Sequence, residues 1–249
     1  DDLNEAIAVV GLPAILKTRT LGYDGKGQSV LRRPEDLPDA WAQVGKVPCI
    51  VESMVEFTRE LSIIAARGRT GELVFYPLSE NHHREGILRL SLSRQGDPLQ
   101  SMAQTLIQRL MDELDYVGIL ALELFQVGDE LYANEMAPRV HNTGHWTIEG
   151  ARTSQFENHL RAICGLPLGA TDAPLQAAMV NVIGRLLDEE TIREFPGATP
   201  HFYGKAERPG RKVGHITLVD AEEGSQLFTK RLASLLELAG EDRLAELME

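Results

Sequence analysis

VGILALELFQVGDELYANEMAPRV, residues 117–140, is the stretch that decides the fold. Two apolar, strand-forming runs flank the polar segment VGDE, a pattern typical of a β-hairpin. In a hairpin centred on Asp129, Glu123 and Glu135 stand directly opposite each other. Directly opposed side chains on one face of such a pair have Cβ atoms about 4.5–5.5 Å apart. The stretch therefore predicts two neighbouring carboxylates on a rigid hairpin.

The predicted carboxylate pair requires a partner. Glu123 lies among leucine and phenylalanine neighbours, so we expect it to be partly desolvated. Two unit charges about 4 Å apart repel by about 4 kcal/mol at an effective dielectric near 20, so the pair needs a cation, a shared proton or water. Hard oxygen ligands suit Mg²⁺, which also binds substrate phosphates, with Mn²⁺ as the alternative ion. The competing interpretation, two solvated glutamates on an exposed face, is disfavoured by the apolar strands. Asn134 adjoins Glu135, but strand alternation places it on the other face.

A glycine-rich stretch, LGYDGKGQSV at residues 21–30, lies between two strand-like runs. Asp-Gly in this setting predicts a hairpin turn. The spacing matches neither the Walker A loop nor the dinucleotide fingerprint. Glycines let backbone N–H groups approach an anion, and Lys26 and Lys17 add positive charge. We interpret the stretch as a hairpin tip that also serves as a lid over phosphates.

Composition narrows the class of protein. A chain of 249 residues can bury a large core. The net charge of −12 argues against broad nucleic-acid binding, because a phosphate backbone needs a basic face. No apolar stretch approaches the roughly 20 residues that span a bilayer. Cys49 and Cys164 are far apart and indicate reduced thiols in a cytoplasmic protein.

Interleaved helical and strand patterns predict an α+β or mixed α/β fold. The spacing over residues 98–115 is typical of an amphipathic helix, and further helices are expected from about residue 223. Between residues 57 and 94 we expect three strands. The loop near residues 166–173 is the candidate domain boundary.

The segment after the hairpin, APRVHNTGHWTIEGARTSQFENH, is dense in polar residues. Arg139, His141 and Asn142 lie within a few positions of one another, with His145 just beyond. A single histidine is more often structural. This density instead favours a loop that contacts substrate.

Together these motifs resemble the ATP-grasp carboxylate–amine ligases, and within them the 5-(carboxyamino)imidazole ribonucleotide synthases of purine biosynthesis. The resemblance runs through most of the chain and is carried by LKTRTLGYDGKGQ, VESMVEFTRELSII, ENHHREGIL, NEMAPRVHNTGHWT and HFYGKAERPGRKVGHIT. It implies an ATP-grasp fold with a small C-terminal α/β domain. The implied parts are a first subdomain at 1–51, a second with the metal site at 52–166, and a substrate-binding domain at 167–249.

The resemblance also implies an activity. ATP phosphorylates bicarbonate to carboxyphosphate, which carboxylates the amine of aminoimidazole ribonucleotide and leaves ADP and phosphate. A closing lid would protect the reactive acyl phosphate from water. The implied partners are these small molecules and a second copy of the chain in a homodimer, with no nucleic acid and no membrane.

Site residues follow from the matched motifs. Those implied for ATP are Lys17, Gly22, Tyr23, Asp24, Gly25, Lys26, Gly27, Gln28, Glu52, Ser53, Met54, Val55, Glu60, His83, Asn134 and Glu135. Those implied for catalysis with bicarbonate or carboxyphosphate are Asp24, Arg139, His141 and Asn142. Those implied for the aminoimidazole nucleotide are Tyr23, Asp24, Arg139, Lys205, Arg208 and Lys212. Glu123 and Glu135 would hold Mg²⁺.

Simpler interpretations remain beside these roles. Glu60 could be a surface strand residue, His82 and His83 an exposed turn pair, and Lys205 to Lys212 a solvated loop. Family members begin with a Rossmann-like domain that this chain lacks, so we expect the chain alone to have little or no activity. The alternative functions are another ATP-grasp ligase and a non-catalytic ATP-binding module.

Overall fold

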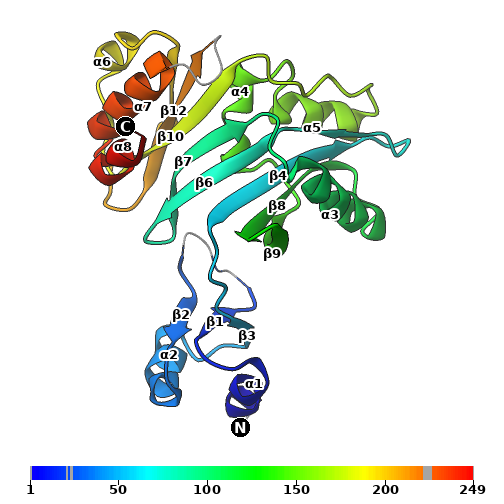
Figure 1. Cartoon of the computed structure of the whole chain (residues 1–249), viewed down its shortest axis with the longest axis vertical. Helices are drawn as coiled ribbons and strands as arrows, with labels where there is room; N and C mark the ends of the chain where they lie inside the picture. Colours follow the sequence, from blue (N-terminus) through cyan, green and yellow to red (C-terminus); the bar gives the residue numbers. More distant parts are fainter. Residues whose placement is uncertain (1, 21, 23–24, 221–225, 249) are drawn as a thin grey trace. The chain divides into compact units, whose positions relative to one another are not determined.

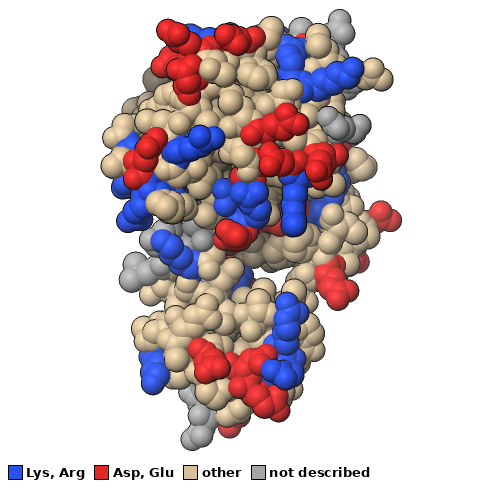
Figure 2. Space-filling model, turned by 90° about the vertical axis from the view of Figure 1, so that its left-hand side faces the viewer, with Lys and Arg blue, Asp and Glu red and all other residues tan. Residues whose placement is uncertain are grey.

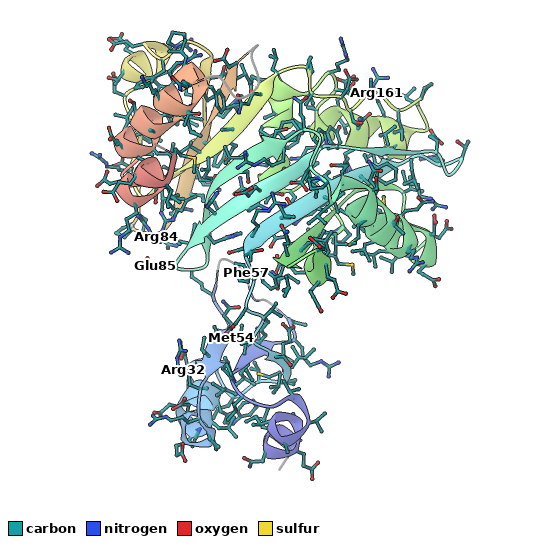
Figure 3. The ribbon with its side chains drawn as sticks, in the orientation of Figure 1. Arg32, Met54, Phe57, Arg84, Glu85 and Arg161 are labelled. Carbon is teal, nitrogen blue, oxygen red and sulfur yellow. The ribbon has the colours of Figure 1, made fainter. Side chains whose placement is uncertain are left out.

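The computed structural model describes residues 2–20, 22, 25–220 and 226–248 and divides the chain into two compact units. The first unit is Asp1–Glu56 with Arg84–Ile87, and the second is Phe57–His83 with Leu88–Glu249. Figure 3 labels Met54 and Phe57 on the segment where the chain passes from the first unit to the second. Within the described ranges, no helix combines the length and the apolar character needed to cross a membrane.

The first unit is a three-stranded antiparallel sheet with two α-helices. Its elements are α1 (Asp2–Val10), β1 (Ala14–Thr18), β2 (Gln28–Leu31), the 3₁₀ turn η1 (Pro34–Asp36), α2 (Leu37–Gln43) and β3 (Cys49–Ser53). The strand order is β2-β1-β3. Alternate residues of the central strand, Ala14 and Leu16, are fully buried against apolar side chains of both helices. The glycine-rich stretch therefore joins two neighbouring strands, as predicted.

The second unit is built on one nine-stranded sheet of order β11-β12-β10-β7-β6-β4-β8-β9, with β5 paired to β4. The strands are β4 (Arg59–Arg67), β5 (Leu73–Phe75), β6 (Leu78–Arg84), β7 (Ile87–Arg94), β8 (Gly118–Val127), β9 (Glu130–Ala137), β10 (Gln176–Ile183), β11 (Ala198–Phe202) and β12 (Lys212–Asp220). The pairings among these strands are antiparallel. A mixed α/β class is therefore confirmed.

Helices cover this sheet at both ends. They are α3 (Gln100–Glu113), η2 (Asn142–Gly144), α4 (Thr147–Gly150), α5 (Gln155–Cys164), α6 (Glu189–Arg193), α7 (Gln226–Leu238) and α8 (Asp242–Met248). Buried side chains of α3 pack on Leu61 and Ile63 of β4, whereas Phe228 and Leu232 of α7 pack on β10 and β12. Figure 1 shows α7 and α8 beside the β10–β12 end of this sheet and α3 beside the β4–β8 end.

Surface charges form local pairs. Figure 2 shows Lys and Arg interspersed with Asp and Glu on the face it draws. Arg161 pairs with Glu157 at 2.7 Å and Arg193 with Glu189 at 2.5 Å, both one helical turn apart. Exposed pairs of this kind contribute about 0–1 kcal/mol each. The buried apolar layers therefore stabilise this unit far more than its surface pairs.

The segment between residues 57 and 94 differs from the prediction. It forms four strands rather than three, because β6 carries the sequence LSENHHR. His82 and His83 therefore lie on a strand and are not an exposed turn pair. Asn and His are weak strand formers, which hid β6 in the sequence. Its polar side chains find partners on neighbouring strands, as His83 does with Glu60.

The predicted helix over 98–115 is observed as Gln100–Glu113. The loop near 166–173, the candidate boundary, connects α5 to β10, and β10 pairs with β7 in the same sheet as the preceding residues. By compactness the chain instead divides at Glu56 and Phe57. The functional division into 1–51, 52–166 and 167–249 stays a prediction.

Candidate active site

Polar side chains recur on adjacent strands of the larger sheet. At one end Glu135 of β9 pairs with Glu123 of β8, which pairs with Ser62 of β4. At the other end Asn181 of β10 pairs with His215 of β12. Ser62, Asn181 and His215 are each at most 2% exposed. Because buried polar groups require hydrogen-bond partners, these two groups mark a candidate site.

The carboxylate pair depends on a β-bulge. The turn is centred on Gly128 and Asp129, since Val127 pairs with Glu130. Without a shift in register, Glu123 would face Asn134. A register shift between Glu123 and Leu124 leaves Asn134 as the extra residue and places Glu135 opposite Glu123. Bulges interrupt alternation, so alternation does not decide the face of Asn134, and its placement stays a prediction.

Burial and mutual repulsion leave the two carboxylates in need of a proton or a cation. Burial raises the pKa of Glu123 to about 7, opposed by nearby His83 and reinforced by the charge of Glu135. One ligand atom each from Glu123, Glu135 and His141 lie within 4.8 Å of one another. Carboxylate oxygens are the ligands that Mg²⁺ prefers, and a bound cation would favour the ionised form of Glu123. The donor set therefore fits a divalent cation.

His141 is held neutral beside this pair. Burial, followed by the charges of Arg139 and Lys212, lowers the pKa of His141 to about 3. Its Nε2 lies 3.6 Å from Glu123 Oε1, and its Nδ1 lies 2.9 Å from Thr143 Oγ1. A neutral imidazole offers one donor and one acceptor. His141 can therefore contact a bound anion beside the two carboxylates without adding charge.

Gln155, at the first turn of α5, holds His141 from outside the loop. Its Oε1 accepts from the His141 backbone N–H at 2.9 Å, and its Nε2 donates to the His141 carbonyl at 2.6 Å. Gln155 is fully buried. His145 Nδ1 lies 3.0 Å from the same carbonyl oxygen and 3.2 Å from Gln155 Nε2. Both the backbone N–H and the backbone carbonyl of His141 are thus hydrogen-bonded.

Asn142 connects the loop to the far end of the sheet. Its side chain forms two hydrogen bonds with the amide of Asn181, at 2.7 and 3.2 Å. Lys212 Nζ lies 3.4 Å from Asn142 Oδ1. The structure thereby brings together Asn142 and Lys212, which were predicted for different ligands. The loop spans both polar groups of the sheet.

His145 of this loop belongs to a cluster of three histidine rings, in which His215 stacks on His201 and is tilted against His145. His215 lies between His201, at a centroid distance of 4.5 Å, and His145, at 5.0 Å. Tyr203 Oη lies 2.7 Å from His215 Nδ1, and His201 Nε2 lies 2.8 Å from Glu149 Oε1. Burial is the main cause that lowers the pKa of His145 to about 4 and that of His215 to about 2. Both rings are therefore neutral near pH 7.

Glu60 and His83 form an ion pair on the same sheet. His83 Nδ1 lies 2.7 Å from Glu60 Oε2, with both side chains less than a quarter exposed. Burial opposes the charged imidazole, but the carboxylates of Glu60 and Glu123 outweigh it and raise the pKa of His83. Glu60 is therefore a paired, half-buried residue rather than a free surface carboxylate.

The described residues of the first unit that are predicted to bind ATP are mostly exposed. Lys17 Nζ pairs with Glu52 Oε2 at 2.6 Å, across neighbouring strands. Met54 N–H donates to the Pro13 carbonyl. The other described members of this set are Gly22, Gly25, Lys26, Gly27, Gln28, Ser53 and Val55. Tyr23 and Asp24 lie outside the described residues.

The predicted basic cluster is divided. Lys212 begins β12 and contacts the Asn142 amide, as above. Lys205 and Arg208 lie in the exposed loop between β11 and β12. Lys205 Nζ lies 4.9 Å from the centroid of the Tyr203 ring. Arg139 is exposed, and its Nη1 donates to the Val140 carbonyl.

Sequence reasoning missed Gln155, Asn181 and His215. Each is a polar residue that the fold buries almost completely. Asn181 and His215 stand within the apolar runs AAMVNVI and VGHITLV, and that interruption was a usable signal. Gln155 gave no such signal, since glutamine is ordinary in the first turn of a helix.

Comparison with known proteins agrees with this geometry. The ATP-grasp domain family matches residues 1–156, more than half of the chain. The chain therefore belongs to the ATP-grasp family, with the mixed α/β fold that the resemblance implied. The phosphoribosylaminoimidazole carboxylase C-terminal domain family matches residues 177–226.

Individual relatives point to one branch of this family. The chain is 55% identical over 224 residues to the N5-carboxyaminoimidazole ribonucleotide synthase of Pseudomonas aeruginosa, covering 90% of the chain and 62% of that relative. The crystal structure of N5-carboxyaminoimidazole ribonucleotide synthetase from Thermus thermophilus is similar with a TM-score of 0.87 at 54% identity, over 95% of this chain and 64% of that one. The synthase of Aspergillus clavatus, in complex with ADP and 5-aminoimidazole ribonucleotide, is similar with a TM-score of 0.86 at 29% identity, over 96% and 65%. The chain thus spans less than two thirds of the length of these relatives.

Proposed function

We propose that this chain is the nucleotide- and substrate-binding part of a ligase that carboxylates 5-aminoimidazole ribonucleotide with bicarbonate and ATP. The observation that carries the proposal is the Glu123–Glu135 pair with neutral His141 beside it. The next residue of the loop, Asn142, contacts Lys212 of β12. The 55% identical relative is named for this product, and the Aspergillus clavatus relative holds ADP with the aminoimidazole nucleotide.

The proposed reaction has two steps. A bicarbonate oxygen attacks the γ-phosphorus of ATP, which releases ADP and forms carboxyphosphate. The amine nitrogen of aminoimidazole ribonucleotide then attacks the carboxyl carbon of carboxyphosphate. Phosphate leaves, and the nitrogen loses a proton. The products are 5-(carboxyamino)imidazole ribonucleotide, ADP and phosphate. Phosphoryl transfer of this kind is accelerated chiefly by positioning and by neutralising charge.

Each group of residues has a role in this scheme. Lys17, Lys26 and the glycine backbone of 22–28 would bind the ATP phosphates. Glu60, paired with His83, would accept from the ribose hydroxyls. Glu123 and Glu135 would hold Mg²⁺ or Mn²⁺, which neutralises charge on the phosphate oxygens.

The remaining residues act on the carboxylating half of the reaction. Arg139, His141 and Asn142 would orient bicarbonate and carboxyphosphate, and a neutral His141 would donate or accept one hydrogen bond there. Lys212, with Lys205 and Arg208, would bind the phosphate of the nucleotide. Tyr23 and Asp24 would contact the aminoimidazole, as the resemblance implies. The resemblance also implies a homodimer, which analytical ultracentrifugation can test.

Carbon tracing tests the proposed reaction directly. The full-length protein is incubated with Mg·ATP, aminoimidazole ribonucleotide and ¹³C-bicarbonate, and the carboxylated amine is followed by ¹³C NMR while ADP is counted. We expect one labelled N-carboxylate for each ADP. Incorporation of formate or another acid instead would indicate a different ATP-grasp ligase. ATP binding with no ADP at all would indicate a non-catalytic module.

A further inference from the structure

Asn181 is an amide placed where an apolar residue would fill the space. It lies in the middle of β10, is 1% exposed, and has valines on both sides in the sequence. Its Nδ2 donates to the Leu88 carbonyl at 2.9 Å and to Asn142 Oδ1 at 2.7 Å. Its Oδ1 accepts from Asn142 Nδ2 at 3.2 Å. Both ends of the amide are therefore occupied.

The Leu88 carbonyl determines which way the amides point. A carbonyl can only accept, so the Asn181 NH₂ group faces it, and the second N–H then faces Asn142. Asn142 must therefore accept this hydrogen bond with its side-chain oxygen. The reversed Asn142 amide would set its NH₂ group against two donors, Asn181 Nδ2 and Lys212 Nζ. One backbone carbonyl thus fixes the orientation of Asn142 through Asn181.

This orientation reaches the charged end of the site. Asn142 Oδ1 is the atom that faces Lys212 Nζ, at 3.4 Å. We propose that Asn181 is a positioning residue, which orients the Asn142 amide and thereby places the Lys212 ammonium for the anionic substrates. The inference rests on the proposed function, because it assigns Asn142 and Lys212 to bicarbonate and to the aminoimidazole nucleotide. Asn181 itself acts only through Asn142.

A second buried asparagine separates positioning from folding. Asn158 of α5 is also fully buried, and its amide bonds to Tyr76 Oη and to the backbone of Gly169. None of these partners is a candidate site residue. If Asn181 served only to satisfy buried hydrogen-bonding groups, replacing either Asn181 or Asn158 would lower stability. Neither replacement would then change substrate binding.

The test compares Asn181→Leu and Asn158→Leu in the full-length protein. For Asn181→Leu we expect KM for bicarbonate and for aminoimidazole ribonucleotide to rise about tenfold, as expected for a lost hydrogen bond near a charged group. KM for Mg·ATP should stay within about twofold. Asn158→Leu should lower Tm and leave all three KM values unchanged. Unchanged KM values in Asn181→Leu, or equal rises in all three, would overturn the inference.

A double mutant identifies the route. If Asn181 acts through Asn142, Asn142→Ala with Asn181→Leu should bind both substrates no worse than Asn142→Ala alone. Additive losses would overturn the inference. Should Asn181→Leu fail to fold, Asn181→Ser makes the same comparison with a smaller side chain that cannot bridge both partners. Absence of turnover in the unmodified protein would instead contradict the proposed function.

Discussion

The glycine-rich loop of the first unit and the loop at residues 138–147 of the second are both predicted to bind anions, but they are built in opposite ways. Gly25 and Gly27 have φ angles of +72° and +77°, and Lys26 is exposed. A Cβ on Gly27 would lie 2.6 Å from Thr18 Oγ1. This loop depends on conformations that only glycine adopts without strain.

The loop at 138–147 depends on side chains that reach it from other elements. Tyr116 Oη donates to the Pro138 carbonyl, and Ser79 Oγ donates to that of Thr143. Gln155 and Asn181 hold His141 and Asn142, as described above. A fully satisfied buried network is rigid and costly to disturb. Replacing a charged side chain should therefore affect binding alone in the glycine loop, whereas replacing a supporting side chain of the second loop should affect binding and stability together.

The largest expected effect is at the carboxylate pair. Glu123→Gln keeps the shape of the side chain but removes the charge that would hold the cation. We expect turnover of the full-length protein to fall by about a hundredfold or more. Tm should be unchanged or higher, because burial already opposes the charge of Glu123. Turnover within about threefold of the unmodified protein would exclude a role in holding the cation.

Breaking the Gln155 contacts should lower both stability and activity. Gln155→Leu leaves the buried N–H and carbonyl of His141 without this partner, so the free energy of unfolding should fall by about 2–4 kcal/mol. Turnover should fall about tenfold as His141 loses its position. Urea unfolding and steady-state kinetics measure the two effects. Arg161→Ala on the same helix is the control, with a change within about 0.5 kcal/mol. Equal changes in unfolding free energy and turnover in both variants would contradict the role of Gln155 in holding His141.

The glycine loop should respond in binding only. Lys26→Ala removes an exposed charge, so KM for ATP should rise by a few-fold to about tenfold with little change in unfolding free energy. Lys230→Ala, exposed on α7, is the matched control and should change neither quantity. A large loss of stability in Lys26→Ala would mean that this loop, too, is held by its side chains.

Acid should destabilise the cluster of His145, His201 and His215 at the second loop. The pKa values of His145 and His215 are lowered by folding, to about 4 and about 2, so the unfolded state binds more protons below its own pKa near 6.5. These two rings should therefore contribute a fall of about 0.7 kcal/mol in the free energy of unfolding between pH 7.5 and 6.5, a contribution that His141 reinforces and that Glu123, whose pKa is raised, opposes. His215→Phe should remove about half of the contribution of the two rings, which is about 0.35 kcal/mol over this interval. An identical slope in the variant would show that His215 does not contribute.

Sequence reasoning predicted the hairpin, the opposed glutamates and the polar loop after them. It missed the bulge at Asn134, because alternation cannot reveal a one-residue bulge that depends on the partner strand. Its simpler alternative for His82 and His83, an exposed turn pair, is wrong, because both lie on β6 and His83 pairs with Glu60 of a separate strand. Gln155 was beyond its reach, because the His141 peptide that it holds lies 14 positions away in the sequence.

The most direct test of the account is ADP release by the full-length protein with Mg·ATP and bicarbonate, with and without aminoimidazole ribonucleotide, for the unmodified protein and for Glu135→Ala. We predict strong stimulation by the nucleotide in the unmodified protein and its loss in Glu135→Ala. Stimulation that survives in Glu135→Ala would contradict the assignment of the carboxylate pair. Binding of Mg·ATP with no ADP release in any combination would contradict the ligase itself.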